Sequence, residues 1–199
     1  MADGTYQPKV YRAQGGDRQV VASGGEIDIE SGGALKFAGE AITATAAELN
    51  AAADVSGRLV TLTGDTAITA ALHAGRTCLL GEVGGDAALA ATLPAATGTG
   101  DRYRFVVSVL NTSGYTIKVA DATDTFNGLF ILLDNDANAV TGYAAIGGDD
   151  TLTLDGTTKG GQVGDWFEVE DIALNTWAVR GSGIVPAGSN VADPFTAAV

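Results

Sequence analysis

Glycine-rich turns divide this chain into short segments, and this limits what it can fold into. The 199 residues include 28 glycines and 4 prolines. Between the glycines, β-branched and other apolar residues recur in runs of about five residues, a common strand length. Glycine adopts the positive φ angles of tight turns, and β-branched side chains pack well on a pleated sheet. The pattern therefore predicts an all-β protein.

The triplet Ser-Gly-Gly occurs at 23–25 and again, eight residues later, at 31–33. Each triplet predicts a tight reversal or bulge. Residues 26–30 alternate acidic and apolar side chains, as a half-buried strand does. We therefore expect short Gly-rich β-ribbon repeats. The repeat gives two sets of equivalent apolar positions and four turn glycines: Val21, Ile29 and Phe37; Ile27 and Leu35; and Gly24, Gly25, Gly32 and Gly33.

A ribbon with so few apolar side chains cannot bury its own face, because an isolated two-stranded ribbon is marginal in water. Such repeats need neighbours to stack on, which are either the large domain of the same chain or copies of the ribbon from other chains. We expect other chains, hence a homo-oligomer. Residues 1–19 are polar and predict an extended N-terminal arm that a partner surface orders; a disordered terminus is the alternative. The expected oligomer or partner contacts are Tyr6, Val10, Tyr11, Val21, Ile27, Ile29, Leu35 and Phe37.

A short helix should follow the ribbon. Thr45 and Glu48 have the spacing of a capping box ahead of Ala- and Leu-rich residues, which predicts a helix over about 46–53. The ribbon repeats and this helix together occupy residues 20–57. We expect residues 58–199 to form a separate domain with a short C-terminal tail.

Strand-like runs recur after Arg58, separated by turn-forming residues, and predict a β-sandwich of jelly-roll type. The apolar runs 105–107 and 129–133 are expected in central strands, and Phe195 is expected to anchor the tail. The predicted strands are 58–62, 67–71, 76–80, 87–93, 103–110, 116–120, 128–133, 139–145, 151–154, 165–171 and 176–181.

The charge balance excludes some partners. Eleven basic residues face 24 acidic ones, a net charge of −13, and the basic residues do not cluster in the sequence. We therefore expect no nucleic-acid binding and no binding to anionic membranes. No apolar run has the length of a membrane span, and the N-terminus lacks the apolar region of a signal peptide. The single Cys78 excludes an internal disulfide and fits a reducing compartment.

Residues for catalysis are sparse. His73 is the one histidine and lies in a turn-like context, and Cys78 is expected to be a buried thiol. Acidic pairs occur at 121 and 124, at 149–150 and at 168–171. A glycosidase would need two carboxylates that face each other across a cleft, whereas scattered carboxylates usually lie on the surface. We expect no enzymatic activity and no cofactor.

Residues 134–138 read Asp-Asn-Asp-Ala-Asn and resemble the start of an EF-hand calcium loop. An EF-hand requires glycine at the sixth position and glutamate at the twelfth. Those positions hold Ala139 and Ala145, so the motif fails. Asp134, Asp136 and Asn138 stay as weak candidates for an ion site of another kind, and an acidic hairpin tip is the alternative.

Trp166, Phe167 and Trp177 form the one cluster of large aromatic residues. Alternation places Trp166, Glu168 and Glu170 on one face of a strand, with Phe167, Val169 and Asp171 on the other. An exposed tryptophan beside carboxylates could bind sugar; packing in a core or at a subunit contact is the alternative.

Residues 42–50, ITATAAELN, resemble a linker of tailed-phage virion proteins. The upstream YRAQGGDRQVVASGGEIDIESGGALKFAG is similar to the N-terminal part of those proteins. TLPAATGTGDRYRFVVSV, TIKVADATDTFNGL and GDWFEVEDIALNTWAV are similar to the β domain that follows. The resemblance implies a homotrimeric capsid decoration (cement) protein, or a short head fibre, bound to the major capsid protein. Such a protein is made in the host cytoplasm and ends on the capsid surface of the virion. A tail- or head-fibre module that binds host glycans is the alternative.

Overall fold

The computed structural model of the chain describes residues 10–12, 15, 19–31, 33–46, 48–49, 56–82 and 89–198. The chain divides into two compact units, Met1–Thr45 and Ala46–Val199. The sequence prediction places its boundaries after residues 19 and 57 instead. Nearly all regular structure is β, which confirms the predicted fold class.

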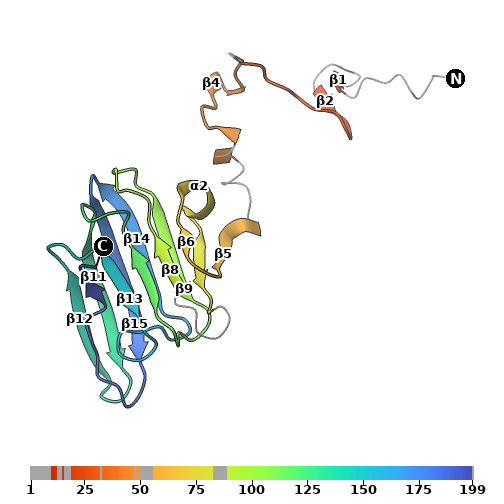
Figure 1. Cartoon of the computed structure of the whole chain (residues 1–199). Coiled ribbons are helices and arrows are strands. Elements are labelled where there is room, and N and C mark those ends of the chain that lie inside the picture. The colour runs from red at the N-terminus through yellow and green to blue at the C-terminus, as the bar shows by residue number, and fades with distance from the viewer. Residues whose placement is uncertain are drawn as a thin grey trace. The chain divides into compact units, whose positions relative to one another are not determined.

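The N-terminal unit contains two small hairpins (Figure 1). Strand β1 (Val10–Arg12) pairs antiparallel with β2 (Gln19–Val21), and β3 (Lys36–Phe37) pairs with β4 (Glu40–Ala41). Ala38 and Gly39 connect β3 to β4 with φ angles of 50° and 91°, which suits a two-residue hairpin turn. The predicted extended arm therefore includes one strand of a hairpin.

Both Ser-Gly-Gly triplets form tight reversals, as predicted. The Gly25 N–H donates to the Ala22 carbonyl, and the Gly33 N–H donates to the Glu30 carbonyl, both at 2.8 Å. Gly24 has a φ of 75°. The strand predicted over 26–30 is absent: these residues have no ladder partner among the described residues of this chain. Alternation favours a strand, but a strand also needs a neighbouring backbone to pair with.

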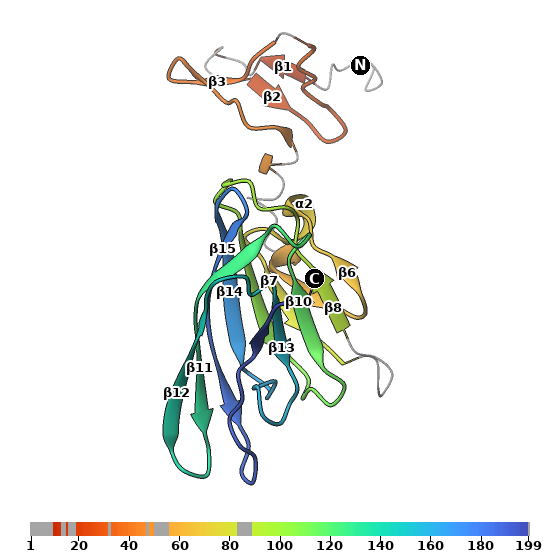
Figure 2. The same ribbon diagram turned by 60° about the vertical axis from the view of Figure 1, so that its left-hand side comes forward.

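The second unit is a two-layered β structure, which the two sheets of Figure 2 show. The larger sheet has the order β12-β11-β15-β14-β9-β7-β5. Its strands are β5 (Leu59–Leu62), β7 (Thr77–Leu80), β9 (Arg102–Val107), β11 (Thr125–Asp134), β12 (Ala139–Ala145), β14 (Trp166–Ala173) and β15 (Thr176–Val185). The smaller sheet has the order β16-β13-β10-β8-β6. Its strands are β6 (Thr66–Ala67), β8 (Leu89–Thr92), β10 (Tyr115–Lys118), β13 (Thr151–Leu154) and β16 (Phe195–Thr196).

Alternate side chains of both sheets meet in one hydrophobic core. Phe105 of β9 stacks on Phe167 of β14, with ring centroids 4.8 Å apart. Ile117 and Leu152 of the smaller sheet are fully buried in the same core. Phe195 is also buried, so the expected anchor of the C-terminal tail is confirmed. Because each sheet gives one face to this core, the other face of each sheet is left outside.

The chain between β5 and β10 alternates between the two sheets. Strands β5, β7 and β9 are parallel neighbours in the larger sheet, and β6, β8 and β10 are parallel neighbours in the smaller one. This segment is therefore a short coil of parallel rungs, which differs from the antiparallel strands of a jelly roll. The strands that follow form antiparallel pairs, except that β11 is parallel to β15.

The predicted strand limits are close to the observed ones, and β12 and β13 coincide with the prediction. The strand predicted over 67–71 is wrong in its second half, where α2 (Ala70–His73) follows β6. Ala and Leu favour helix, but one helical turn is too short to show periodicity. Of the two apolar runs expected in central strands, the one in β9 has four strands beyond it on one side and two on the other, whereas β11 lies beside the edge strand β12.

The described part of the helix expected over 46–53 is helical, at residues 46, 48 and 49, and the rest of that range lies outside the described residues. A 3-10 turn, η1 (Ser56–Arg58), leads into β5. Among the described residues, no helix is long and apolar enough to cross a membrane.

Candidate partner-binding surfaces

The N-terminal unit exposes five of the apolar side chains that the sequence singles out as partner contacts. None of these five belongs to the hydrophobic core. Their exposed fractions run from 40% to 67% for Val21, Ile27, Ile29, Leu35 and Phe37. Tyr6 and the turn residue Gly32 lie outside the described residues, and for Val10 and Tyr11 the structure describes the backbone, in β1. The exposed side chains form a surface that this unit does not cover by itself.

The outer face of the larger sheet is the second candidate surface. Along β14, Phe167 and Val169 are buried in the core, while Trp166, Glu168 and Glu170 are half-buried on the other face. This confirms the predicted alternation. Trp177 is fully buried and packs against Tyr103, with ring centroids 5.7 Å apart, so packing explains one of the two tryptophans.

Four arginines from three strand regions gather on this outer face. We call Arg76, Arg102, Arg104 and Arg180, with Glu168 and Glu170, the arginine patch. Arg102 Nη2 lies 2.9 Å from Glu170 Oε1, and Arg180 Nη2 lies 3.7 Å from Glu170 Oε2. The first pairing holds the pKa of Arg102 above its usual value. The Arg104 guanidinium carbon lies 5.1 Å from the centroid of the Trp166 ring, within cation–π range.

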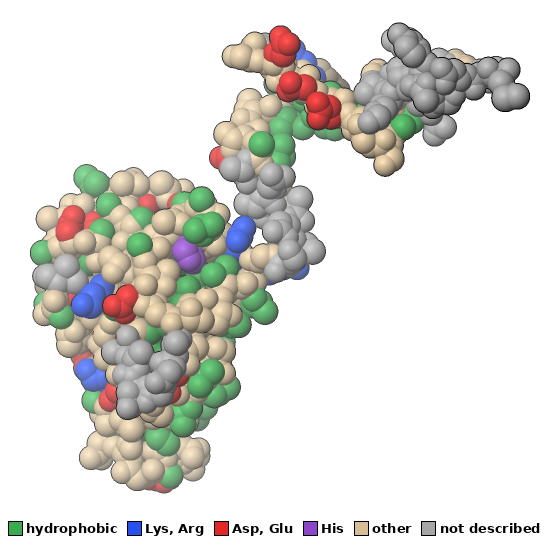
Figure 3. All heavy atoms as spheres, turned by 45° about the vertical axis from the view of Figure 1, so that its right-hand side comes forward, with side chains coloured by type: hydrophobic (Ala, Val, Ile, Leu, Met, Phe, Trp, Pro, Cys, Tyr) green, Lys and Arg blue, Asp and Glu red, His purple; other side chains and the backbone are tan. Residues whose placement is uncertain are grey.

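A hollow of about 180 Å³ lies at one side of the patch. It is lined by three arginines, Arg76, Arg102 and Arg104, and by Gly75, Thr77 and Glu168. Basic residues that are scattered in the sequence are therefore brought together by the fold. On the face drawn in Figure 3, basic side chains are scattered, some of them beside acidic ones, and form no basic stripe of the kind that nucleic acid needs.

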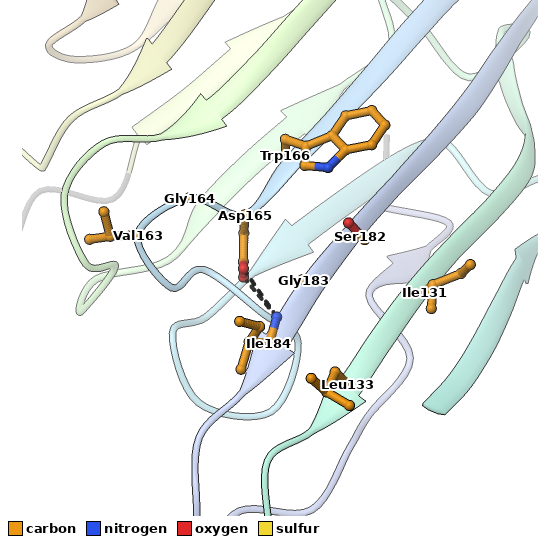
Figure 4. Close-up of a pocket in the computed structure, with 9 residues that line it drawn as sticks. All are labelled: Ile131, Leu133, Val163, Gly164, Asp165, Trp166, Ser182, Gly183 and Ile184. Carbon is orange, nitrogen blue, oxygen red and sulfur yellow. Dashed lines mark hydrogen bonds between the residues drawn. The ribbon is translucent and has the colours of Figure 1, made fainter. Parts of the chain in front are cut away.

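A larger and mostly apolar hollow lies along β11, β14 and β15 (Figure 4). Its volume is about 440 Å³, and we call it the apolar groove. The lining residues are Ile131, Leu133, Val163, Gly164, Asp165, Trp166, Ser182, Gly183 and Ile184. Trp166 thus borders the groove and also supports Arg104 of the arginine patch.

Asp165 is the one carboxylate among the described residues that line the groove. It is buried, and its Oδ2 accepts the backbone N–H groups of Gly161 at 2.8 Å, Gln162 at 3.0 Å and Ile184 at 3.1 Å. Burial raises the pKa of Asp165, and the hydrogen bonds oppose this only in part. The carboxylate holds its own loop to the end of β15, and a glycosidase would need a second carboxylate opposite it.

The other acidic pairs also bind nearby loops. The buried Asp124 accepts the Ala96 N–H at 3.1 Å, and burial raises its pKa. Asp149 accepts the Ile146 N–H at 3.0 Å, and the buried Asp150 accepts the Ala198 N–H at 2.7 Å. Asp121 accepts the Thr123 N–H at 2.8 Å. These carboxylates cap turns at the ends of strands.

The weak ion-site candidates lie in the tight turn between β11 and β12. Asp134 Oδ1 accepts the N–H groups of Asp136 at 2.9 Å and Ala137 at 3.1 Å. Asp136 accepts the Gly188 N–H, and Asn138 has a φ of 50°. Within the described part of the chain, no group of three or more His, Cys, Asp or Glu side chains could hold a metal ion. The geometry is that of an acidic hairpin tip.

The side chains of His73 and Cys78 are both buried. His73 is buried at the end of α2, and its Nδ1 accepts the Thr69 N–H at 3.0 Å, which satisfies a donor at the start of the same helix. Cys78 is fully buried in β7, and burial raises the pKa of its thiol to about 11, although Arg76 lowers it slightly. At neutral pH such a thiol is protonated and a poor nucleophile.

Sequence reasoning missed the arginine patch. Arg104 lies in the strand predicted over 103–110 and Arg102 directly precedes it, and their spacing of two residues indicates a shared face. Arg76 and Arg180 come from distant strands, and local patterns do not predict their approach. Comparison with models of protein families found no match for this chain, and neither curated proteins nor solved structures matched it.

Proposed function

We propose that this chain is a non-enzymatic structural protein of a phage virion, which assembles as a homotrimer and stabilises the capsid shell. The observation that carries the proposal is the exposure of Ile27, Ile29, Leu35 and Phe37 in a unit that buries none of them. The resemblance of residues 42–50 and of the flanking segments to phage virion proteins is the reason for proposing a location on the capsid and an assembly of three copies.

The physical basis of assembly is burial of the ribbon side chains against those of other copies. Full burial of an isoleucine or phenylalanine side chain stabilises by about 1.5–3 kcal/mol. Phe37 and Ile27 are 67% and 66% exposed, so much of this free energy is still to be gained. Each copy contributes the same residues, and three linked attachment arms would bind a shell more tightly than one through a raised effective concentration.

The proposed self-association is tested by the mass in solution. Light scattering at micromolar concentration should give three times the 20.0-kDa chain mass. Joint replacement of Ile27 and Phe37 by serine should shift the protein toward monomer. Joint replacement of Ile146 and Leu174 by serine is the matched control, because both are 71% exposed in the second unit. A monomeric parent would contradict the proposal.

The proposed shell attachment is tested by deletions within the first 19 residues. We assign the contact with the major capsid protein to this arm. Deleting residues 1–9 leaves the β1–β2 pairing intact, whereas deleting residues 1–19 removes β1 and the first residue of β2. Phage particles made without this protein should bind the parent in co-sedimentation, and the 1–19 deletion should bind at background level. Undiminished binding of that deletion would rule out the arm as the anchor.

The fibre alternative is favoured by one observation, the half-exposed Trp166 beside Glu168 and Arg104 on an open sheet face. Aromatic rings of this kind can stack on sugars. Electron microscopy of labelled virions separates the two roles, because a decoration protein covers the shell and a fibre module extends from the tail or from a few head positions.

A further inference from the structure

The arginine patch reverses the charge balance of the chain. The whole sequence has 24 acidic and 11 basic residues. The patch has four guanidinium groups and the two carboxylates of Glu168 and Glu170, so it has two positive charges in excess. The side chains of Arg102 and Arg180 are 60% and 62% exposed, whereas that of Glu170 is 18% exposed. The positive groups are thus the accessible part of the patch.

Two of these guanidinium groups are already arranged to bind carboxylates. Arg102 and Arg104 occupy alternate positions of β9, so they point to the same side with backbones roughly 7 Å apart. Arg104 lies over the Trp166 ring, which restricts its rotamers and leaves its in-plane N–H donors free. Arg76 and Arg104 form no ion pair with a carboxylate of the described residues.

The acidic segment, residues 26–30, has the complementary pattern. Glu26, Asp28 and Glu30 alternate with Ile27 and Ile29. All five residues are exposed and pair with no strand of the described chain. In an extended backbone the alternate carboxylates would point to one side, again roughly 7 Å apart. The spacing of the carboxylates therefore matches that of Arg102 and Arg104.

We propose that the acidic segment of one copy docks on the arginine patch of a second copy. This inference rests on the proposed self-association and adds its polar contact. Docking pairs at least two carboxylates with guanidinium groups of the patch, of which Arg76 and Arg104 form no ion pair with the described residues of their own chain. It also leaves Ile27 and Ile29 on the opposite side of the segment, where they can pack with the ribbons of other copies.

Charge reversal tests the contact in the full chain. Arg102→Glu with Arg104→Glu should raise the trimer dissociation constant by about tenfold or more, because like charges then face each other. Lys118→Glu with Lys159→Glu makes the same change of charge outside the patch, and should leave the dissociation constant unchanged. Sedimentation velocity over a dilution series measures each constant, and thermal unfolding checks that each variant is folded.

Complementary reversal identifies the occupant. Glu26→Arg with Asp28→Arg should weaken the trimer alone and restore it when combined with the reversed patch. Mixing the two singly reversed proteins should recover assembly in part, because a ring of three copies that contains both proteins matches two of its three segment–patch contacts. If neither the combined chain nor the mixture recovers, the acidic segment is not the occupant of the patch. If the combined chain recovers and the mixture does not, the segment docks within its own chain, which also overturns the inference.

The remaining outcomes separate this inference from the proposed function. A stable trimer that is unaffected by the reversed patch overturns the inference and leaves the proposed assembly standing. A monomeric parent overturns both. If the patch instead binds polygalacturonate, as measured by calorimetry, and its reversal leaves the trimer unchanged, an acidic glycan is the occupant and the inference fails.

Discussion

The carboxylate of Asp171 accepts both the backbone N–H and the side-chain hydroxyl of Thr99, each at 3.0 Å. The same carboxylate accepts the N–H groups of Thr97 at 3.1 Å and Gly98 at 2.7 Å. Asp171 is buried in β14, and the loop that it binds precedes β9 in the chain. One side chain thus satisfies the backbone of a loop more than seventy residues away.

Asp171→Ala should reduce the free energy of unfolding by about 2 kcal/mol, because it leaves three part-buried backbone N–H donors, those of Thr97, Gly98 and Thr99, without their acceptor. Urea denaturation of the parent and the variant measures the difference. Asp121→Ala is the control: Asp121 caps an exposed turn at Thr123, so its removal should have a much smaller effect. Equal losses in the two variants would show that burial of the Asp171 bonds does not matter.

The pKa values of two buried carboxylates predict opposite dependence on pH. Burial alone would raise the pKa of Asp171, but the hydrogen bonds from Thr99, Gly98 and Thr97 outweigh it and lower the pKa. The stabilisation from ionised Asp171 is therefore present above the unfolded pKa of about 3.9 and is lost as pH falls through the lower folded value. For Asp165 burial prevails and the pKa is raised, so its contribution is lost as pH rises from about 4 through the folded value.

Asp171→Asn and Asp165→Asn test these signs. The stability advantage of the parent over Asp171→Asn should shrink below pH 4. The advantage of the parent over Asp165→Asn should instead be larger near pH 4 than at pH 7. Urea unfolding at pH 3.5, 4.5, 5.5 and 7 gives both profiles. If the advantage of the parent changed with pH in the same direction for both variants, the environments of Asp171 and Asp165 would not differ in the way that their contacts imply.

Gly128→Ala should prevent or greatly weaken folding of the second unit. Gly128 has a φ of 153°, and a Cβ there would lie 1.8 Å from the Val179 carbonyl oxygen across the parallel β11–β15 pair. Separating these backbones should cost about 3 kcal/mol or more. Gly64→Ala is the matched control, because its Cβ would meet nothing within 4 Å. Soluble yield and urea midpoints should separate the two variants clearly.

The Ser-Gly-Gly turns should matter to assembly more than to the β domain. Valine at position 24 would be strained by the φ of 75°. Valine at position 33 would bring its Cβ to 2.7 Å from Ile29 Cγ2 and 3.0 Å from the Glu30 carbonyl oxygen. Gly24→Val and Gly33→Val should therefore raise the trimer dissociation constant and leave thermal unfolding of the second unit nearly unchanged. Trimers as stable as the parent would make these turns ordinary surface loops.

The positions of strands could be predicted from sequence, but their pairing could not. Ala139–Ala145 and Thr151–Leu154 were predictable because turn residues bound them and β-branched and apolar residues recur between them. The parallel coil of β5 to β10 was not, because register between strands some 20 residues apart depends on core packing. The alternation at 26–30 shows the opposite case: a local strand pattern formed no strand, and no backbone of the described residues pairs with it.

The candidate surfaces were partly predictable. Exposure of Ile27 and Phe37 follows from too few apolar neighbours in the ribbon. The two buried carboxylates had a signal, since Asp171 of β14 and Asp165 just before it share the alternation of Phe167 and Val169. The loop that satisfies Asp171 could not be known, because it comes from another part of the chain.

The parallel coil also determines how the second unit could change in size during evolution. Residues that pair across neighbouring rungs are 18 apart between β5 and β7 (59 and 77) and 27 apart between β7 and β9 (77 and 104). Strands β5 and β6, which form the first rung, also end their two sheets. A duplicated segment of one rung could therefore be added at that end without re-pairing any existing strand. The parallel coil would then differ in length by whole rungs, while the antiparallel strands and their outer face stayed the same.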